Sequence, residues 1–153
     1  KGNIVASVPT GTGVLIMANR NVEIFDNAFD ENGTANVMIV GYRYDYKDEK
    51  YQPLPRQIIV RDNAHGRAGY APGFDGGAQI AAAMGGAIPP VLWDGAGEDV
   101  IILDKVAALS LGLPDVATPR EQAKPVPVDL SKGTPPAALP GITLPESMEA
   151  KVQ

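Results

Sequence analysis

Proline is concentrated in the C-terminal part of the chain, and this distribution limits what that part can fold into. Eight of the 14 prolines follow Leu113, at positions 114, 119, 125, 127, 135, 136, 140 and 145. Proline fixes φ and has no N–H, so it breaks helices and is confined to the edges of sheets. We therefore divide the chain into a β-rich body, residues 1–112, and an extended Pro-rich C-terminal arm, residues 113–153.

Before the arm, short apolar segments alternate with turn residues, a pattern typical of consecutive β-strands. The strands predicted from this pattern are 3–8, 14–18, 22–26, 36–46, 56–62 and 100–104. Their close spacing indicates a meander of neighbouring strands, and no internal repeat of the length found in solenoids or propellers is apparent. The predicted fold class is mainly β: a small β-sandwich or barrel with one or two short helices.

Two short helical segments are expected inside this body. The first covers 76–84, where Asp75 offers a side-chain cap, alanines favour helix, and Gly85 suits a left-handed end. The second is a turn or two over 105–112.

The arm contains one segment whose proline spacing indicates how it binds. Successive N–H groups of an extended strand point to opposite edges, so Pro125 and Pro127 remove donors from one edge only. Val126, Val128 and Leu130 keep their donors on the other edge. This segment is predicted to pair with a sheet on one side and to block further pairing on its second side.

The length of the arm indicates contacts with other subunits. Fully extended at about 3.1 Å per residue, 113–145 would reach roughly 100 Å, several times the ~13 Å radius of gyration of a compact body of this size. Its apolar residues are expected to anchor it in a groove. The predicted partner-binding residues are Val126, Val128, Leu130, Leu139, Ile142, Leu144, Tyr42 and Tyr44.

The two tyrosines in that prediction belong to an aromatic stripe. In a strand over 36–46, Tyr42, Tyr44 and Tyr46 share one face, and Arg43 and Asp45 share the other. Such a stripe packs within a sheet or an interface, or offers a stacking platform for a ligand. Packing is favoured, because aromatic residues are common strand formers.

No catalytic pattern is complete. The single histidine, His65, lies near Asp62 in sequence, but the four serines lie in no recognisable nucleophile motif. We expect no enzyme, and keep as an alternative a small hydrolase or ligand-binding domain that uses His65 and Asp62.

Metal sites and cofactors are not predicted either. Without cysteine and with one histidine, the chain lacks the usual ligands of structural zinc. The loop 26–34 fails as an EF-hand, because it lacks carboxylates at the first and last ligand positions. The loop 94–99, with Asp94, Glu98 and Asp99, leaves calcium binding open.

The charge and hydropathy exclude two classes of partner. A net charge of −5 and a pI of about 4.8 offer no clustered cations to nucleic acid or anionic lipid. The longest apolar run, 14–18, is far shorter than the ~20 residues that span a bilayer. Neither nucleic-acid binding nor membrane insertion is expected.

These observations favour a non-enzymatic structural subunit of a large assembly, anchored by its C-terminal arm to other protein subunits, as a homo-oligomer or a capsid component. The first expectation is a virion or phage particle protein, with a head-stabilising, decoration or minor structural role. The alternative is a subunit of a secretion or pilus machine in a bacterial cell envelope.

Overall fold

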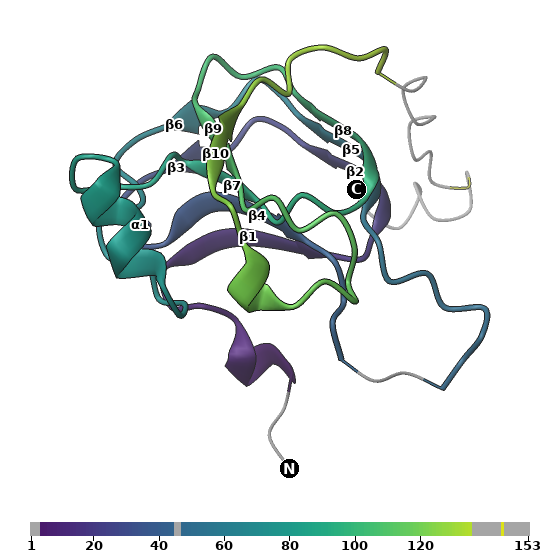
Figure 1. The fold of residues 1–153 in the computed structure, drawn as a ribbon. Helices are drawn as coiled ribbons and strands as arrows, with labels where there is room; N and C mark the ends of the chain where they lie inside the picture. The colour runs from purple at the N-terminus through teal and green to yellow at the C-terminus, as the bar shows by residue number, and fades with distance from the viewer. Residues whose placement is uncertain (1–3, 45–46, 136–144, 146–153) are drawn as a thin grey trace.

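The computed structural model describes residues 4–44, 47–135 and 145, and its regular elements are mostly strands (Figure 1). The prediction of a mainly β protein is confirmed. The strands are β1 (Thr12–Met17), β2 (Arg20–Ile24), β3 (Ala28–Phe29), β4 (Ala35–Val40), β5 (Arg56–Val60), β6 (Ala64–His65), β7 (Val91–Trp93), β8 (Glu98–Ile102), β9 (Ala108–Ser110) and β10 (Val126–Val128). The helices are α1 (Gly77–Ala83) and two 3-10 turns, η1 (Ile4–Ser7) and η2 (Arg120–Gln122).

From β1 to β9, a strand does not pair with the next strand in sequence. It pairs with a strand two or three further along the chain, after the chain has passed through the other sheets. The first sheet has the order β1-β4-β7-β9-β10, the second β2-β5-β8 and the third β3-β6, and every pair except β9–β10 is parallel. The chain thus visits three sheets in turn and starts again one strand further along. Three coils, residues 12–34, 35–90 and 91–107, are stacked as in a parallel β-helix, and the third has strands in the first two sheets only (Figure 1).

The predicted meander is wrong, and the sandwich or barrel is not confirmed. Between β1 and β2 the chain does not reverse into a hairpin. It bends at Ala18, whose φ of 54° is left-handed, and continues into a different sheet. The inner strands β4 and β9 of the first sheet are also buried on both faces, which is typical of parallel sheets.

The expectation that the chain has no internal repeat is also wrong. Register places Asp26-Asn27-Ala28-Phe29 of coil 1 beside Asp62-Asn63-Ala64-His65 of coil 2, with Phe29 opposite His65. Two insertions in coil 2, residues 41–55 and 66–90, conceal this similarity because they give successive coils very different lengths.

Inside the stack, equivalent positions of successive coils form apolar columns. Ile58 and Val60 in the middle coil are fully buried. Each column consists of aliphatic residues along the stack, so every coil covers the apolar surface of the next. The three main columns are Val22–Ile58–Val100, Ile24–Val60–Ile102 and Val14–Val37–Val91–Ala108.

A second apolar cluster lies on the outer face of the first sheet, under α1. Ala81 of the helix packs with Met38, Leu92 and Leu109 of the sheet. The helix predicted over 76–84 is therefore present, but its predicted cap is wrong: the N-cap residue is Gly76, with φ of 80° and no side-chain cap.

Three other predicted segments differ from the structure. Residues 105–112 contain β9 instead of helical turns, since the column position of Ala108 requires an extended chain. The predicted strand 3–8 contains the 3-10 turn η1, and the strand predicted over 36–46 ends at Val40.

The first half of the arm belongs to the body. Strand β10 lies antiparallel to β9 at the end of the first sheet, with Val126 opposite Ser110 and Val128 opposite Ala108. Leu130 O then accepts the N–H of Ile102 at 2.9 Å, across the end of the second sheet. The body therefore continues past the boundary predicted at residue 112.

Truncating a column in the middle coil tests this packing. Ile58→Ala should lower the free energy of unfolding by about 2–5 kcal/mol, since the neighbouring coils hold the cavity open. Leu103→Ala is the matched control, because Leu103 is 43% exposed, and should change it by less than about 0.5 kcal/mol. Urea titration measures both, and equal effects would contradict the proposed interior.

Candidate functional site

A ladder of polar side chains runs along the stack where the second sheet turns toward the third. Asn27 of coil 1 donates its backbone N–H and its side-chain amide to Asn63 Oδ1, each at 3.0 Å. Asn63 repeats the pattern one coil further, with its N–H on Asp104 Oδ1 at 3.1 Å and its amide on Asp104 Oδ2 at 2.9 Å. Each coil therefore donates to the next, and Asp104, which only accepts, ends the ladder.

A second polar chain reaches Asp104 from inside the stack. Asn32 Nδ2 donates to Asn36 Oδ1 at 2.9 Å, and Asn36 Nδ2 contacts His65 Nδ1 at 3.3 Å. An amide NH₂ can only donate, so Nδ1 accepts and the proton of the imidazole is on Nε2. Nε2 lies 2.9 Å from Asp104 Oδ2. Both polar chains thus converge on one carboxylate.

The Asp104 carboxylate is stabilised as an anion. Its side chain is 4% exposed and that of His65 is 2% exposed. Burial by itself would raise the pKa of Asp104, but the hydrogen bonds from Asn63 and His65 outweigh burial and hold this pKa below its usual value. The arrangement fixes the turns of three coils.

The predicted pairing of His65 with Asp62 is wrong. Asp62 bonds to Arg61 at 2.6 Å and is largely exposed, whereas His65 turns inward and packs against Phe29, with ring centroids 5.4 Å apart. Because both ring nitrogens are bonded inside the stack, the geometry gives His65 a structural role. Asp104 was missed because it lies far away in sequence. The repeated Asp-Asn-Ala of 26–28 and 62–64 was the available signal.

A buried ion pair fastens the loops at one corner of the stack. Asp94 is 2% exposed, and its carboxylate accepts the N–H of Gly41 and of Ala96, each at 2.9 Å. Arg43 bonds to Asp94 at 3.3 Å and donates to the carbonyl oxygens of Val116 and Thr118. Desolvation by burial raises the pKa of Asp94. The pair links the 41–55 insertion, coil 3 and the start of the arm.

These bonds also change the interpretation of the acidic loop. The Asp94 carboxylate points into the protein, while Glu98 and Asp99 are exposed, so the three do not form a calcium ligand set. Across the described part of the chain, no three His, Asp or Glu side chains gather as metal ligands.

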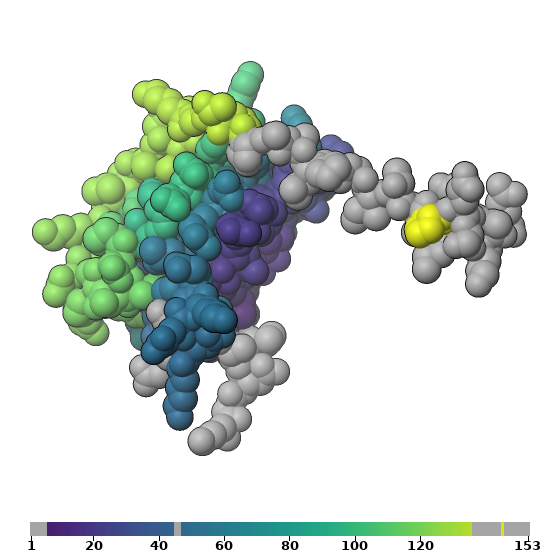
Figure 2. All heavy atoms as spheres, turned by 90° about the vertical axis from the view of Figure 1, so that its right-hand side faces the viewer, coloured from purple at the N-terminus to yellow at the C-terminus, as the bar shows by residue number. Residues whose placement is uncertain are grey.

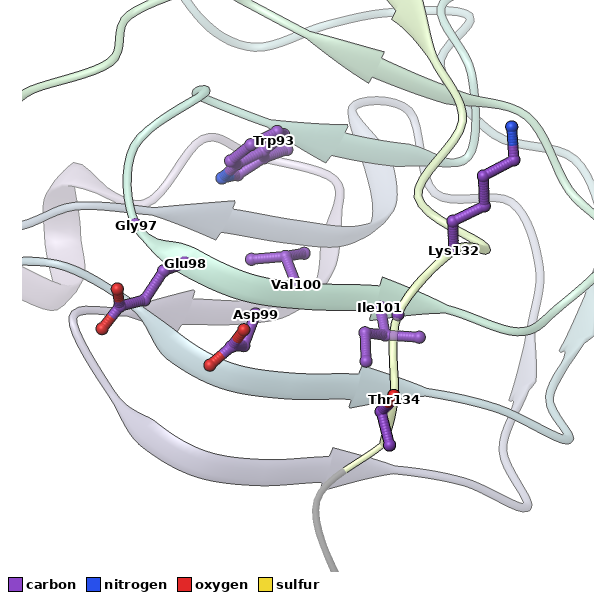
Figure 3. A pocket seen from close by; sticks show the side chains of 9 residues that line it. Trp93, Gly97, Glu98, Asp99, Val100, Ile101, Lys132 and Thr134 are labelled. Atoms are coloured by element: carbon purple, nitrogen blue, oxygen red, sulfur yellow. The ribbon is translucent and has the colours of Figure 1, made fainter.

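A shallow groove of about 290 Å³ lies beside this loop, between β8 and the segment that follows β10. In Figure 3, Glu98 and Asp99 point away from Lys132, so charged groups do not converge on a ligand position. Trp93, on one wall, donates its indole N–H to Ala96 O at 2.7 Å. The groove carries no chemical signature of its own.

The tyrosines lie on the 41–55 insertion rather than on a strand. Tyr42 packs against Tyr44 and Tyr51, with ring centroids 5.4 and 5.3 Å apart, and Tyr44 bonds to Ser7. In Figure 2 this insertion (blue) projects at the bottom of the view, whereas the yellow-green segment around 125–135 lies at the top. The predicted strand is therefore wrong at Tyr42 and Tyr44, although these two rings do pack together, and Tyr46 lies outside the described residues.

The predicted partner-binding residues of the arm fall into two groups. Val128 and Leu130 pack against the body's own interior, and Val126 is 50% exposed. The other three lie outside the described residues, so their role stays a prediction: Leu139, Ile142 and Leu144.

The two ends of the stack differ, and this difference is the clearest functional feature of the structure. At one end, β10 carries Pro127 opposite Leu109, so the outer edge of the first sheet lacks a donor there. At the other end, β1, β2 and β3 each pair on one side only within the described chain. The first sheet is therefore closed by β10 at one end and open at the other, whereas β8 and β6, which end the other two sheets, also pair on one side only within the described residues.

This chain matches no protein-family model, and comparisons with curated proteins and with solved structures give no significant match. Within the described residues, no helix has the length and apolar character needed to cross a bilayer. The function must therefore be inferred from the geometry.

Replacing the carboxylate at the end of the ladder should weaken the stack in a pH-dependent way. Asp104→Asn places an amide donor against the donors of Asn63 and His65, and should cost about 1–3 kcal/mol at pH 7. The folded pKa of Asp104 is depressed, so its contribution is present above the unfolded pKa of about 3.9 and is lost as pH falls through the folded pKa.

Urea unfolding of the parent and of Asp104→Asn at pH 7, 4 and 3 measures this effect. The gap in stability should narrow below about pH 4, and a gap of constant size would show that charge is not involved. Exposed Asp62→Asn is the control, with a change under about 0.5 kcal/mol at pH 7.

Removing the proline at the closed end should create a second open edge. Pro127→Val restores a backbone N–H on the outer side of β10, and an unprotected edge pairs with other chains. We expect sedimentation velocity to show self-association beyond that of the parent as concentration rises. Val126→Thr leaves Pro127 in place and is the control, so its self-association should match that of the parent. If Pro127→Val also sedimented like the parent, the capping role of Pro127 would be contradicted.

Proposed function

We propose that this protein is a non-enzymatic structural subunit of a large assembly. The observation that carries the proposal is the contrast between the two ends of the first sheet: one is closed by β10 with Pro127, whereas at the other β1 leaves its edge free, beside the free edges of β2 and β3, among the described residues. Repeat proteins need a capping element at a terminal repeat, and an uncapped end is a site for pairing.

The chemistry of the interior supports the same function. The groups that resemble catalytic residues, His65 and Asp104, are bonded to each other and to the asparagine ladder, with side chains 2% and 4% exposed. A general base has to reach the proton that it removes. In this position the pair stabilises the stack, and the hydrolase alternative is the weaker proposal.

The particle that the proposal favours is a virion or phage particle, in which this chain serves as a head-stabilising, decoration or minor structural protein. A cell-envelope secretion or pilus machine is the alternative within the same class. In either case Leu139, Ile142 and Leu144 are the residues of the arm proposed to contact neighbouring subunits. They follow the part of the arm that caps the body.

Truncation of the distal arm tests the proposal. Because β10 belongs to the body, the cut is placed after Pro135, which keeps the cap and Leu130. We expect the chain ending at Pro135 to stay folded by circular dichroism but to be lost from the native particle. The full chain should sediment as part of a particle in the megadalton range.

A full chain that sediments as a stable monomer from its native source would contradict the assembly role. A truncated chain that still joins the particle would contradict the role of the distal arm. Recovery with nucleic-acid-containing particles distinguishes the virion from the envelope machine, for which recovery with the membrane fraction is expected.

A further inference from the structure

We propose that the open end of the stack, formed by β1, β2 and β3, docks one further parallel coil from a partner subunit, and that this coil carries asparagine at the ladder position. The inference rests on the proposed function, since it names the partner's chemistry. Three features of the described residues support it: the backbone edge, the ladder and the interior columns.

The backbone of β2 presents free donors at this end. Ile24 O accepts the N–H of Arg61 at 3.0 Å, so Ile24 faces coil 2. Successive residues of a strand point to opposite edges, so the N–H and C=O of Glu23 face the open side. No proline interrupts β2 there, in contrast to β10 at the closed end.

The same alternation holds in β1. Ala18 donates its N–H to Val40 O at 3.0 Å, and therefore Met17 and Leu15 face the open side. The N–H of Met17 is bonded to the side chain of Asn19 at 3.2 Å. The N–H of Leu15 is left for a strand of the added coil.

The ladder specifies which residue the added coil must supply. Each rung donates a backbone N–H and a side-chain amide to the oxygen of the next rung, as Asn27 does to Asn63. No described group donates to Asn27 Oδ1. An asparagine one coil before it would supply both donors, whereas an aspartate would place a second acceptor against this oxygen.

The interior columns also stop at this end. Val37 and Ile58 are fully buried in coil 2, whereas Val14 and Val22 in coil 1 are only partly buried. A coil with Val or Ile at the equivalent positions would bury this apolar surface.

A second copy of this chain does not fit the edge in the direction that extends the stack. At the end that it would have to present, β10 with Pro127 covers the first sheet and Leu130 accepts the N–H of Ile102. The ladder also ends there in the Asp104 carboxylate, which has no amide to donate to Asn27. The occupant is therefore a coil of a different subunit.

Duplicating coil 1 tests whether the edge accepts a further coil. In this chimera a second copy of 12–34 is inserted between Thr34 and Ala35, so the outer copy presents its own asparagine to the inner copy. Amide exchange by NMR should show the N–H of Glu23 in the inner copy slowed by roughly tenfold or more relative to the parent.

The matched control is the same chimera with Asn27→Asp in the outer copy only. This substitution keeps the size of the side chain but replaces the amide donor by an acceptor. Most of the slowing should disappear. An inner Glu23 that exchanges as fast in the chimera as in the parent would overturn the inference.

A second arm tests the partner subunit in the native particle. Glu23→Ala removes the side chain that pairs with Arg61 at 2.6 Å but keeps the outward N–H, whereas Glu23→Pro removes both. We expect Glu23→Ala to be incorporated into the particle. The amount of Glu23→Pro in the particle should be at least tenfold lower. Equal incorporation would overturn docking of a partner at this edge.

The two proposals can fail separately. If the parent is monomeric but the Glu23 N–H of the inner copy exchanges slowly in the chimera, the assembly role is overturned, and the capacity of the edge to take a coil is supported. If the native particle is large but the Glu23 N–H of the inner copy exchanges as fast as in the parent, the inference about the edge is overturned, and the assembly role is supported.

Discussion

Parallel pairing between one coil and the next is the constraint on which the rest of this structure depends. Every strand from β1 to β9 finds its partner one circuit away, so each coil must follow the path of its neighbour. Val22, Ile58 and Val100 stack because of this, and so do the other interior columns. Insertions are accommodated only where they leave this path, as in 41–55 and 66–90 of coil 2.

A single buried carboxylate holds the turns in this register. Asp104 receives the ladder from Asn63 and the inner chain from His65, and its hydrogen bonds outweigh the effect of burial on its pKa. A buried charge is costly when unpaired, so coil 2 must supply donors to this carboxylate in the correct places. The polar chains therefore specify the register, and the apolar columns supply most of the burial.

The local sequence predicted the strands better than their arrangement. Strands near 14–18, 22–26, 56–62 and 100–104 follow from apolar runs between turn residues, and the helix near 76–84 follows from its alanines. Because these strands follow one another closely in the sequence, hairpins between neighbouring strands were predicted. The residue pattern within one strand does not reveal which other strand it pairs with. His65 likewise suggested Asp62, since its true partner, Asp104, becomes its neighbour only through the stacking of coils. The shared Asp-Asn-Ala carried the missing information.

The chain is a coil stack whose first coil leaves its outer edge unpaired among the described residues, and amide hydrogen exchange of the isolated wild-type chain tests that claim most directly. Residue-resolved NMR should show slow exchange at Ile16 and Ile24, whose N–H groups face coil 2, and fast exchange at Leu15 and Glu23, whose N–H groups face the open side. Slow exchange at all four positions would contradict an open end.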